Sequence, residues 1–416
     1  MSSGEVVVQD RRIRVALFAT HPIQYHIPWF QRLAVVPELD FKVFFGLLPD
    51  AVQQGVGFDV GFQWDIPLLD GYRWELLPNV AKTPSLGTFG GCDTPEVGWV
   101  LRDWRPDVAI LTGWQSRMLT QAWWACVRLD IPRIVRGESN HLAPRSGWKR
   151  FRHRMWLKGF DRFLAIGQAN RTFYREAGIP AERIHDCLYF IDNQRFAAAA
   201  AKLHSHRAEL RRGWGIPTDV VCFLFSGKLI PKKHPLDLLH ALSQAIRSGV
   251  RAHVLMAGSG ELLESARALV EREQLPVTFA GFLNQSEIVR AYVAADCLVL
   301  PSDTGETWGL VVNEAMACGL PAIVSDQVGC GPDLILQGET GALFPMGDVP
   351  ALAAQLMEFA IDPVRLSMLG ARARRRVLAD YSVEQAVVGT LAAVCAVARS
   401  EEREMRNAGL LSDRWR

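Results

Sequence analysis

Glu306 and Glu314 stand eight residues apart in the segment PSDTGETWGLVVNEAMACGLP, and their spacing suits the binding of a phosphorylated, hydroxyl-rich ligand. The segment predicts a loop followed by a helix that begins near Gly309. Unsatisfied N–H groups at that helix N-terminus, from about Thr307 to Val311, attract a diphosphate. Glu306 precedes the helix and Glu314 lies about a turn and a half inside it, so both carboxylates can bind hydroxyls beside the phosphate. The alternative for Glu314 is a buried structural carboxylate that pairs with a lysine.

A lysine-rich loop follows an earlier strand of the same half. The predicted strand, residues 220–226, runs into Gly227 and then into Lys228, Lys232 and Lys233. Cations and a glycine at the carboxyl end of a parallel strand are typical of phosphate sites in α/β sheets. The alternative is a solvated lysine loop.

The first half carries polar side chains after two of its predicted strands. His21, Gln24 and His26 follow the first strand, and Glu138 and His141 follow a later one. Such positions form binding sites at the edge of a parallel sheet, so we expect a ligand-binding site there. Alternatively, some of the side chains that follow the first strand cap the next helix. Glu138, Asn140 and His141 all remain candidates for the side chain that faces the reacting group.

The segment Arg145 to Lys158, RSGWKRFRHRMWLK, combines six lysines or arginines with aromatic side chains and contains no acid. On a helix, Trp148, Phe151 and Met155 line one apolar side with cations around it. This pattern is typical of a helix that lies on an anionic membrane. The alternative is an amphipathic helix that packs its aromatic side chains into the domain.

Short β-branched runs alternate with helical patterns along the chain, which predicts an α/β fold of two Rossmann-like domains. We expect the first domain over residues 1–213, the second over 214–385, and a helical tail over 386–416 that packs back on the first domain. Strands are expected at residues 14–20, 41–45, 107–111, 133–136, 162–166, 220–226, 253–257, 277–280, 297–301 and 322–325. Helices are expected at residues 27–33, 94–104 with Thr94 as N-cap, 116–129 and 383–398.

The composition is that of an ordinary globular protein. The 416 residues include 46 basic and 44 acidic side chains, a balance too even for a protein that coats nucleic acid. Eight scattered cysteines with no CxxC pair argue against a zinc site and a disulfide framework. The apolar stretches are too short for a signal peptide or a membrane span. We therefore expect a cytoplasmic protein, peripheral at most at the inner face of the membrane.

The two glutamates form the E-x7-E pattern of retaining glycosyltransferases of family four (glycosyl transferases group 1), which have the GT-B fold, and the surrounding segment resembles that family's most characteristic stretch. GKLIPKK resembles the family's G-R-L-x-x-x-K loop, with Lys228 at the arginine position and Lys233 at the lysine position. The resemblance covers roughly residues 220–355. It is weaker in the first half, where the glycine pair common after the first strand is missing.

The resemblance implies two domains that face a cleft, with a nucleotide-diphosphate sugar as donor in the second domain (residues 214–385) and the acceptor in the first (residues 1–213). Lys228 and Lys233 would neutralise the departing diphosphate, Glu314 would bind the ribose, and Glu306 would hold the sugar. The other implied donor contacts are Gly227, Phe282, Gly305, Thr307, Trp308, Gly309 and Leu310.

Retention would occur on one face of the sugar, with a phosphate oxygen as base, which leaves Glu138, His21 and His141 as positioning or proton-handling groups. No metal or other cofactor is expected, because the sequence contains no DxD pair.

The acceptor implied by the resemblance is a glycan or lipid-linked sugar of envelope or exopolysaccharide synthesis. The alternatives are a nucleotide-sugar epimerase of the same fold and a catalytically silent nucleotide-sugar-binding scaffold. A phosphorylase is disfavoured because no segment suggests a lysine-bound pyridoxal phosphate. A nicotinamide oxidoreductase is disfavoured because Leu263 replaces the third glycine of a GxGxxG fingerprint.

Overall fold

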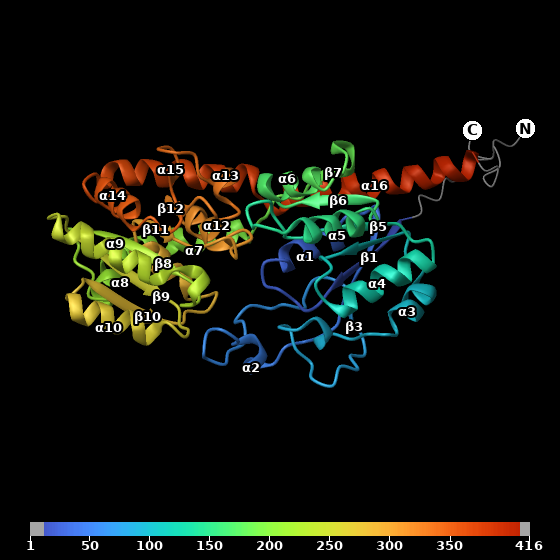
Figure 1. Ribbon diagram of the computed structural model, residues 1–416, viewed down its shortest axis with the longest axis horizontal. Helices are drawn as coiled ribbons and strands as arrows, with labels where there is room; N and C mark the ends of the chain where they lie inside the picture. Colours follow the sequence, from blue (N-terminus) through green and yellow to red (C-terminus); the bar gives the residue numbers. More distant parts are fainter. Residues whose placement is uncertain (1–11, 408–416) are drawn as a thin grey trace, which may run out of the picture.

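The structure, a computed structural model, describes residues 12–407, and its strands form two parallel sheets that lie beside each other (Figure 1). The first sheet has the order β3-β2-β1-β4-β5-β6-β7. Its strands are β1 (Ile13–Ala19), β2 (Leu39–Phe45), β3 (Trp74–Leu76), β4 (Val108–Leu111), β5 (Arg133–Val135), β6 (Arg162–Ala165) and β7 (Ile184–Asp186). The central strands are apolar throughout because helices cover both faces of the sheet, as in other parallel sheets.

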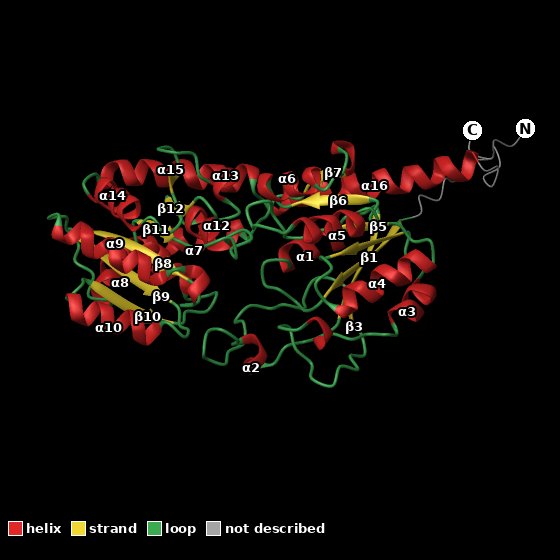
Figure 2. Cartoon of the chain, in the orientation of Figure 1, coloured by secondary structure: helices red, strands yellow, loops and turns green. Residues whose placement is uncertain are grey.

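The second sheet has the order β10-β9-β8-β11-β12-β13. Its strands are β8 (Val221–Ser226), β9 (Ala252–Ala257), β10 (Val277–Gly281), β11 (Cys297–Leu300), β12 (Ala322–Ser325) and β13 (Gly341–Phe344). Figure 2 shows each set of strands in yellow between red helices. Both sheets are Rossmann-like, and the predicted fold class is confirmed.

The helices of the first domain are α1 (Ile27–Ala34), α2 (Ala51–Gln54), α3 (Val97–Trp104), α4 (Arg117–Arg128), α5 (Gly147–Leu157) and α6 (Gln168–Glu176). Those that follow are α7 (Asn193–Leu203), α8 (Arg207–Gly213), α9 (Pro235–Arg247), α10 (Leu263–Glu273), α11 (Ile288–Ala294), α12 (Leu310–Ala317), α13 (Gly331–Leu334), α14 (Val349–Ala360), α15 (Pro363–Asp380) and α16 (Val383–Asn407). Short 3-10 turns are η1 (Phe89–Gly91), η2 (Ala181–Arg183), η3 (His204–His206) and η4 (Pro231–Lys233).

The chain passes between the two domains twice. It first leaves the first domain before α7, because α7 packs against α11 and α12 of the second domain. This crossing lies nearer Asn193 than the boundary expected at residue 213. It returns after α15, and α16 packs on α1, β6 and β7, where Val394 and Val397 complete the core of the first sheet. The first domain is therefore built from two separate parts of the chain. The second domain is the stretch between the two crossings.

One helical stretch among the described residues, Pro363–Ala398, is long and apolar enough by length and composition to cross a membrane, contrary to the expectation from the sequence. The stretch contains the break between α15 and α16, at Tyr381 and Ser382. Buried residues from both of its helices belong to the two domain cores, so we interpret it as core helices.

The predicted strands lie within one or two residues of the observed ones, but three short strands, β3, β7 and β13, were not expected. The expected N-cap at Thr94 is wrong. The helix begins at Val97, with Glu96 as N-cap, because residues 94–97 first form a turn in which the Val97 N–H donates to the Thr94 carbonyl.

Candidate functional site

The N-terminus of α12 lies at the junction of the two domains. Its N-cap is Gly309, whose φ is +102° and where a Cβ would stand 2.9 Å from a Leu300 methyl, so the turn requires glycine. Within residues 12–407, the N–H groups from Thr307 to Leu310 donate no hydrogen bond to another protein group. The predicted helix start is therefore present, with free donors at its positive end.

Glu306 and Lys233 form an ion pair beside this helix N-terminus. Their side chains are 14% and 12% exposed, so the pair is largely shielded from water. The neighbouring Lys232 Nζ donates to the carbonyl of Gly305 at 3.2 Å. Two predicted site residues from segments far apart in the sequence thus meet, and they place a cation and a carboxylate next to free N–H donors.

Lys228 and Phe282 are covered by a bridging loop, residues 55–65, that reaches from the first domain to the second (Figure 1, after α2). Lys228 Nζ donates to the Val56 carbonyl at 2.6 Å, and burial together with the neighbouring lysines lowers its pKa. The Phe62 ring lies 4.3 Å from the Phe282 ring between centroids. Asn284 Nδ2 also donates to the Gln63 carbonyl at 2.8 Å. The loop therefore links the domains over the residues expected to contact the nucleotide.

Glu314 is buried, with 2% of its surface exposed, and it pairs with no lysine among the described residues. Its carboxylate accepts hydrogen bonds from Tyr292 at 2.6 Å, Tyr25 at 3.1 Å and Gln285 at 3.4 Å. Burial raises its pKa, although these three donors act in the opposite direction. Tyr25 belongs to the first domain, so this bond joins the two domains at the position expected to hold the ribose.

A cavity of about 400 Å³ opens at the carboxyl ends of the first domain's strands and includes Thr307 of the second domain. His21, His26 and Glu138 line it. Burial lowers the pKa of His21 to about 4 and that of His26 well below its usual value, so both imidazoles are neutral near pH 7. Glu138 accepts a hydrogen bond from Thr307 Oγ1 at 3.4 Å. The cavity thus lies against the N-terminus of α12.

Arg136 and Tyr189 support this cavity, and neither was identified from the sequence. The Tyr189 hydroxyl donates to Glu138, and the Arg136 guanidinium lies over the Tyr189 ring at 4.5 Å. Arg136 is 1% exposed, contacts His26 Nε2 at 3.1 Å, and leaves Nε and Nη2 without a partner among the described residues. Arg136 is recognised as a site residue only because its charged side chain is buried against the cavity. The sequence carries no pattern that predicts the burial of one arginine.

The structure separates the other predicted residues. His141 lies outside this cavity and lines a different one, so the loop after β5 directs Glu138, and not His141, toward the junction. Gln24 is nearly buried and does not line the cavity. Trp308 is 3% exposed, and its Nε1 donates to Asn313 at 2.8 Å, so its side chain belongs to the core. Gly227 lies at the start of the lysine loop, directly after β8, and Leu310 is the first residue of α12.

Asp333 joins the domains on another side of the junction. Its carboxylate accepts the Gln168 N–H at 2.9 Å and caps α6 of the first domain, which has no cap of its own. The Tyr381 hydroxyl donates to the same carboxylate at 3.3 Å. Asp333 is 1% exposed, and burial raises its pKa to about 6. A Cβ on Gly167, just before α6, would stand 2.3 Å from the Trp308 ring, so the domains meet closely here.

No group of three or more histidine, cysteine, aspartate or glutamate side chains within residues 12–407 is arranged to hold a metal ion. The charged groups at the junction are instead the Lys233–Glu306 pair and the free N–H groups of α12. This arrangement can stabilise negative charge on a diphosphate.

The sequence and the fold were compared with those of known proteins. The profile of the family described as "Glycosyl transferases group 1" matches residues 206–376. A GDP-mannose-dependent alpha-mannosyltransferase of Mycobacterium tuberculosis is 32% identical over 68% of this chain and 71% of its own length. A GDP-mannose-dependent phosphatidylinositol monomannoside mannosyltransferase of Corynebacterium glutamicum is 29% identical over 47% of this chain, and the match spans about half of that relative's length.

Among solved structures, that of Anabaena Alr3699/HepE in complex with UDP superposes with a TM-score of 0.69 at 18% identity, covering 92% of this chain and all of that one. A glycosyltransferase from Rickettsia africae superposes with a TM-score of 0.70 at 14% identity, over 93% of this chain and 98% of the other. These likenesses show the GT-B fold. The mycobacterial match and the family profile show that the chain belongs to the glycosyl transferases group 1 family.

Proposed function

We propose that the protein transfers a sugar from a nucleotide-diphosphate sugar to an acceptor hydroxyl, with retention of configuration and without a metal ion. The observation that supports this most directly is the Lys233–Glu306 pair beside the free N–H groups of α12, facing a cavity of the first domain across Thr307. The donor diphosphate would lie at the α12 N-terminus and the acceptor in the cavity.

In the proposed reaction, the bond between the anomeric carbon and the diphosphate oxygen breaks, and a bond forms from that carbon to the acceptor oxygen. Lys233 and the α12 N–H groups stabilise the charge that develops on the diphosphate. The acceptor proton passes to the departing phosphate oxygen, because His21, with its pKa lowered to about 4, is a weak base. Glu138, held by Tyr189, positions the acceptor.

Two features indicate that the closed site excludes water. The bridging loop covers Lys228 and Phe282, and direct bonds across the junction link Tyr25 to Glu314 and Asn140 to Thr307. Closed domains exclude water, which would otherwise hydrolyse the donor.

The names of the relatives suggest where to look for substrates. Several relatives are described as GDP-mannose-dependent, and some of these are described as acting on phosphatidylinositol mannosides. A relative of Salmonella typhimurium is described as a putative colanic acid biosynthesis glycosyltransferase. We therefore propose GDP-mannose as the first donor to test, and a lipid-linked or glycan acceptor of the cell envelope.

Thermal-shift measurements with GDP, UDP, ADP and their sugars test the donor site, with and without EDTA. A nucleotide that binds the folded protein raises its melting temperature. Lys233→Ala should abolish the shift, whereas Lys202→Ala, an exposed lysine on α7, should preserve it. NMR of the product then reads the anomeric configuration. Absence of a shift with every nucleotide, or an inverted product, would contradict the proposal.

A further inference from the structure

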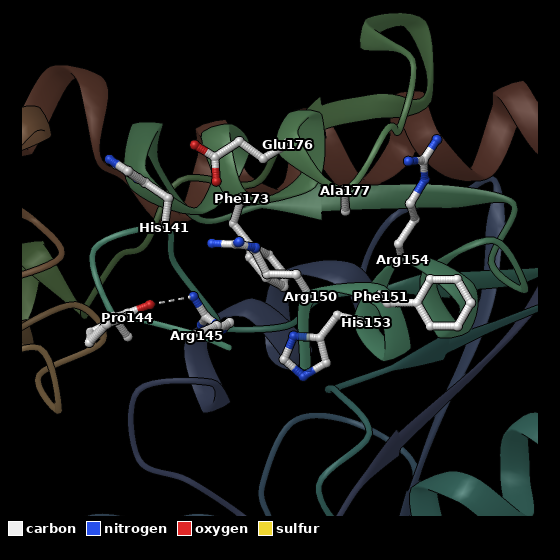
Figure 3. Close-up of a pocket in the computed structure, with 11 residues that line it drawn as sticks. His141, Pro144, Arg145, Arg150, Phe151, His153, Arg154, Phe173, Glu176 and Ala177 are labelled. Carbon is white, nitrogen blue, oxygen red and sulfur yellow. Dashed lines mark hydrogen bonds between the residues drawn. The ribbon is translucent and has the colours of Figure 1, made fainter. Parts of the chain in front are cut away.

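A second cavity lies on the outer side of the first domain, between α5 and α6, and the proposed transfer does not use it. Its volume is about 420 Å³. Figure 3 shows Arg145, Arg150 and Arg154 around it, together with His141 and His153. Three guanidinium groups at one cavity are suited to a phosphate.

The charge around this cavity is almost wholly positive. Within the described residues, none of the arginines and lysines of residues 145–158 forms an ion pair with an acid. The one acid that lines the cavity is Glu176, which is exposed at its edge. Burial and the surrounding cations Arg145, Lys149 and Arg152 lower the pKa of His153, which reflects the same positive potential.

Arg145 is already fixed in place. Its Nη1 donates to the carbonyls of Asn140 at 2.6 Å and Ala143 at 2.9 Å, and its guanidinium lies 4.8 Å from the Phe173 ring centroid. Arg150 and Arg154 are exposed and have no hydrogen-bond partner for their side chains among the described residues. The cavity therefore combines one anchored cation with two that are free to bind an anion.

Large apolar side chains project beside the cavity from α5. Trp148, Phe151 and Met155 are 68%, 53% and 51% exposed, and the rings of Trp148 and Phe151 stack at 5.7 Å. The interpretation in which these side chains pack into the domain is therefore wrong. His153, Trp156 and Leu157 of this helix turn inward, where the His153 ring lies 5.7 Å from the Phe173 ring and the Trp156 ring lies 4.6 Å from the Trp123 ring.

Another exposed tryptophan lies on α4, and ring contacts link it to α5 through the partly buried Trp123 and Trp156. Trp124 is 50% exposed, and its ring lies 4.8 Å from that of Trp123, which in turn contacts Trp156 of α5. Exposed tryptophans among cations are typical of surfaces at a membrane interface. Large apolar side chains that are exposed together on a protein surface are typical of an interaction site, because contact with water is unfavourable for them.

We propose that α5 and the cavity beside it dock the protein on an anionic phospholipid bilayer, with Trp148, Phe151 and Met155 in the interface and a lipid headgroup phosphate between Arg150 and Arg154. Charge complementarity favours this occupant, because anionic lipids attract clustered arginines and lysines and an apolar edge enters the headgroup region. The proposal goes beyond sugar transfer and does not depend on it.

The position of the cavity relates docking to the junction. Glu138 lines the cavity at the junction and His141 lines the docking cavity, and only two residues of one loop, Ser139 and Asn140, lie between them. A docked protein would hold its junction close to the bilayer, where the head of a lipid-linked acceptor lies.

Sedimentation with lipid vesicles tests the proposal. The wild-type protein should bind vesicles of phosphatidylcholine mixed with phosphatidylglycerol, bind phosphatidylcholine alone weakly, and dissociate as salt rises. The double variant Arg150→Gln/Arg154→Gln should bind anionic vesicles roughly tenfold or more weakly. The matched double variant Arg372→Gln/Arg375→Gln removes two exposed arginines of α15 and should bind as the wild type does.

A second pair of changes tests the apolar contribution. Trp148→Ser/Phe151→Ser should weaken binding at low salt without changing its salt dependence, and tryptophan emission should no longer shift to shorter wavelength on adding vesicles. Every variant should keep a melting temperature close to that of the wild type, which shows that it is folded whether or not a nucleotide binds.

The other outcomes would overturn the proposal. Equal binding to neutral and anionic vesicles, or equal loss in the α15 variant, would show no specific docking site. If inorganic phosphate raises the melting temperature of the protein but vesicles do not bind, the cavity would be assigned to a free phosphate compound. Binding of an oligonucleotide but not of vesicles, with the same dependence on Arg150 and Arg154, would assign it to nucleic acid.

Discussion

Asp333→Asn should change how the stability of the protein depends on pH. Asp333 is 1% exposed, and burial raises its pKa to about 6, compared with about 3.9 in an unfolded chain. Between these values the folded state binds more protons than the unfolded state. Stability from this group is therefore greatest at low pH and is lost as pH rises from about 4 to about 6. Asparagine has nearly the same shape but does not titrate.

The size of the effect follows from the shift. Two pKa units correspond to about 3 kcal/mol, of which about 2 kcal/mol falls between roughly pH 4.5 and pH 7.5. The variant should gain this amount relative to the wild type as pH rises over that interval. A domain of comparable size changes its melting temperature by about 2–4 °C for each kcal/mol, so the difference should move by roughly 4–8 °C.

Calorimetric melting of both proteins at a series of pH values measures this difference and cancels every other titration. Asp362→Asn is the matched control, because Asp362 also caps a helix, α15, but is exposed. This control removes a capping carboxylate of the same kind from an exposed position. A constant Asp333→Asn difference over this interval, or a gain of the wild type relative to the variant at high pH, would contradict the expectation.

Contacts across the junction and the proposed metal independence lead to three further expectations. Tyr25→Phe removes one donor from the buried carboxylate of Glu314 and frees it for ribose hydroxyls, so calorimetric titration should show nucleotide affinity rising by roughly tenfold; weaker binding would show that Tyr25 supports the nucleotide instead. Gly167→Ala places a Cβ 2.3 Å from the Trp308 ring, so melting temperature and transfer rate should both fall, and wild-type behaviour would mean that the domains do not meet this closely in solution. EDTA should leave the transfer rate unchanged in an assay of sugar transfer, and a loss restored by Mg²⁺ or Mn²⁺ would contradict the proposed metal independence.

The long strands were predictable because both faces are covered, which produces continuous apolar runs such as Val15–Ala19. The start of α12 was predictable because a glycine turn and a polar loop precede an apolar helix. The strand β3, Trp74–Leu76, was not predictable, because it has three residues and Leu76 is 44% exposed. A short strand at the edge of a sheet carries too little apolar pattern to distinguish it from a loop.

The contacts at the junction were not predictable for a different reason. Tyr25 and Glu314 are separated by 289 residues, and Asp333 caps a helix in the other domain. Such partners come together only when the two domains pack against each other. No local pattern of residue types in the sequence predicts that packing. The positions of Glu138 and His141 also depend on the path of one loop, which places Glu138 at the junction and His141 at the outer cavity.

The return of α16 to the first domain has a consequence for synthesis of the chain. The core of the first sheet includes Val383, Ala393 and Val397, so the first domain is incomplete until those residues have left the ribosome. The second domain is built from one continuous stretch, α7 to α15, and needs no later residues for its core. We expect the domain that is translated second to finish folding first, with the earlier half exposing the face that α16 covers while translation continues.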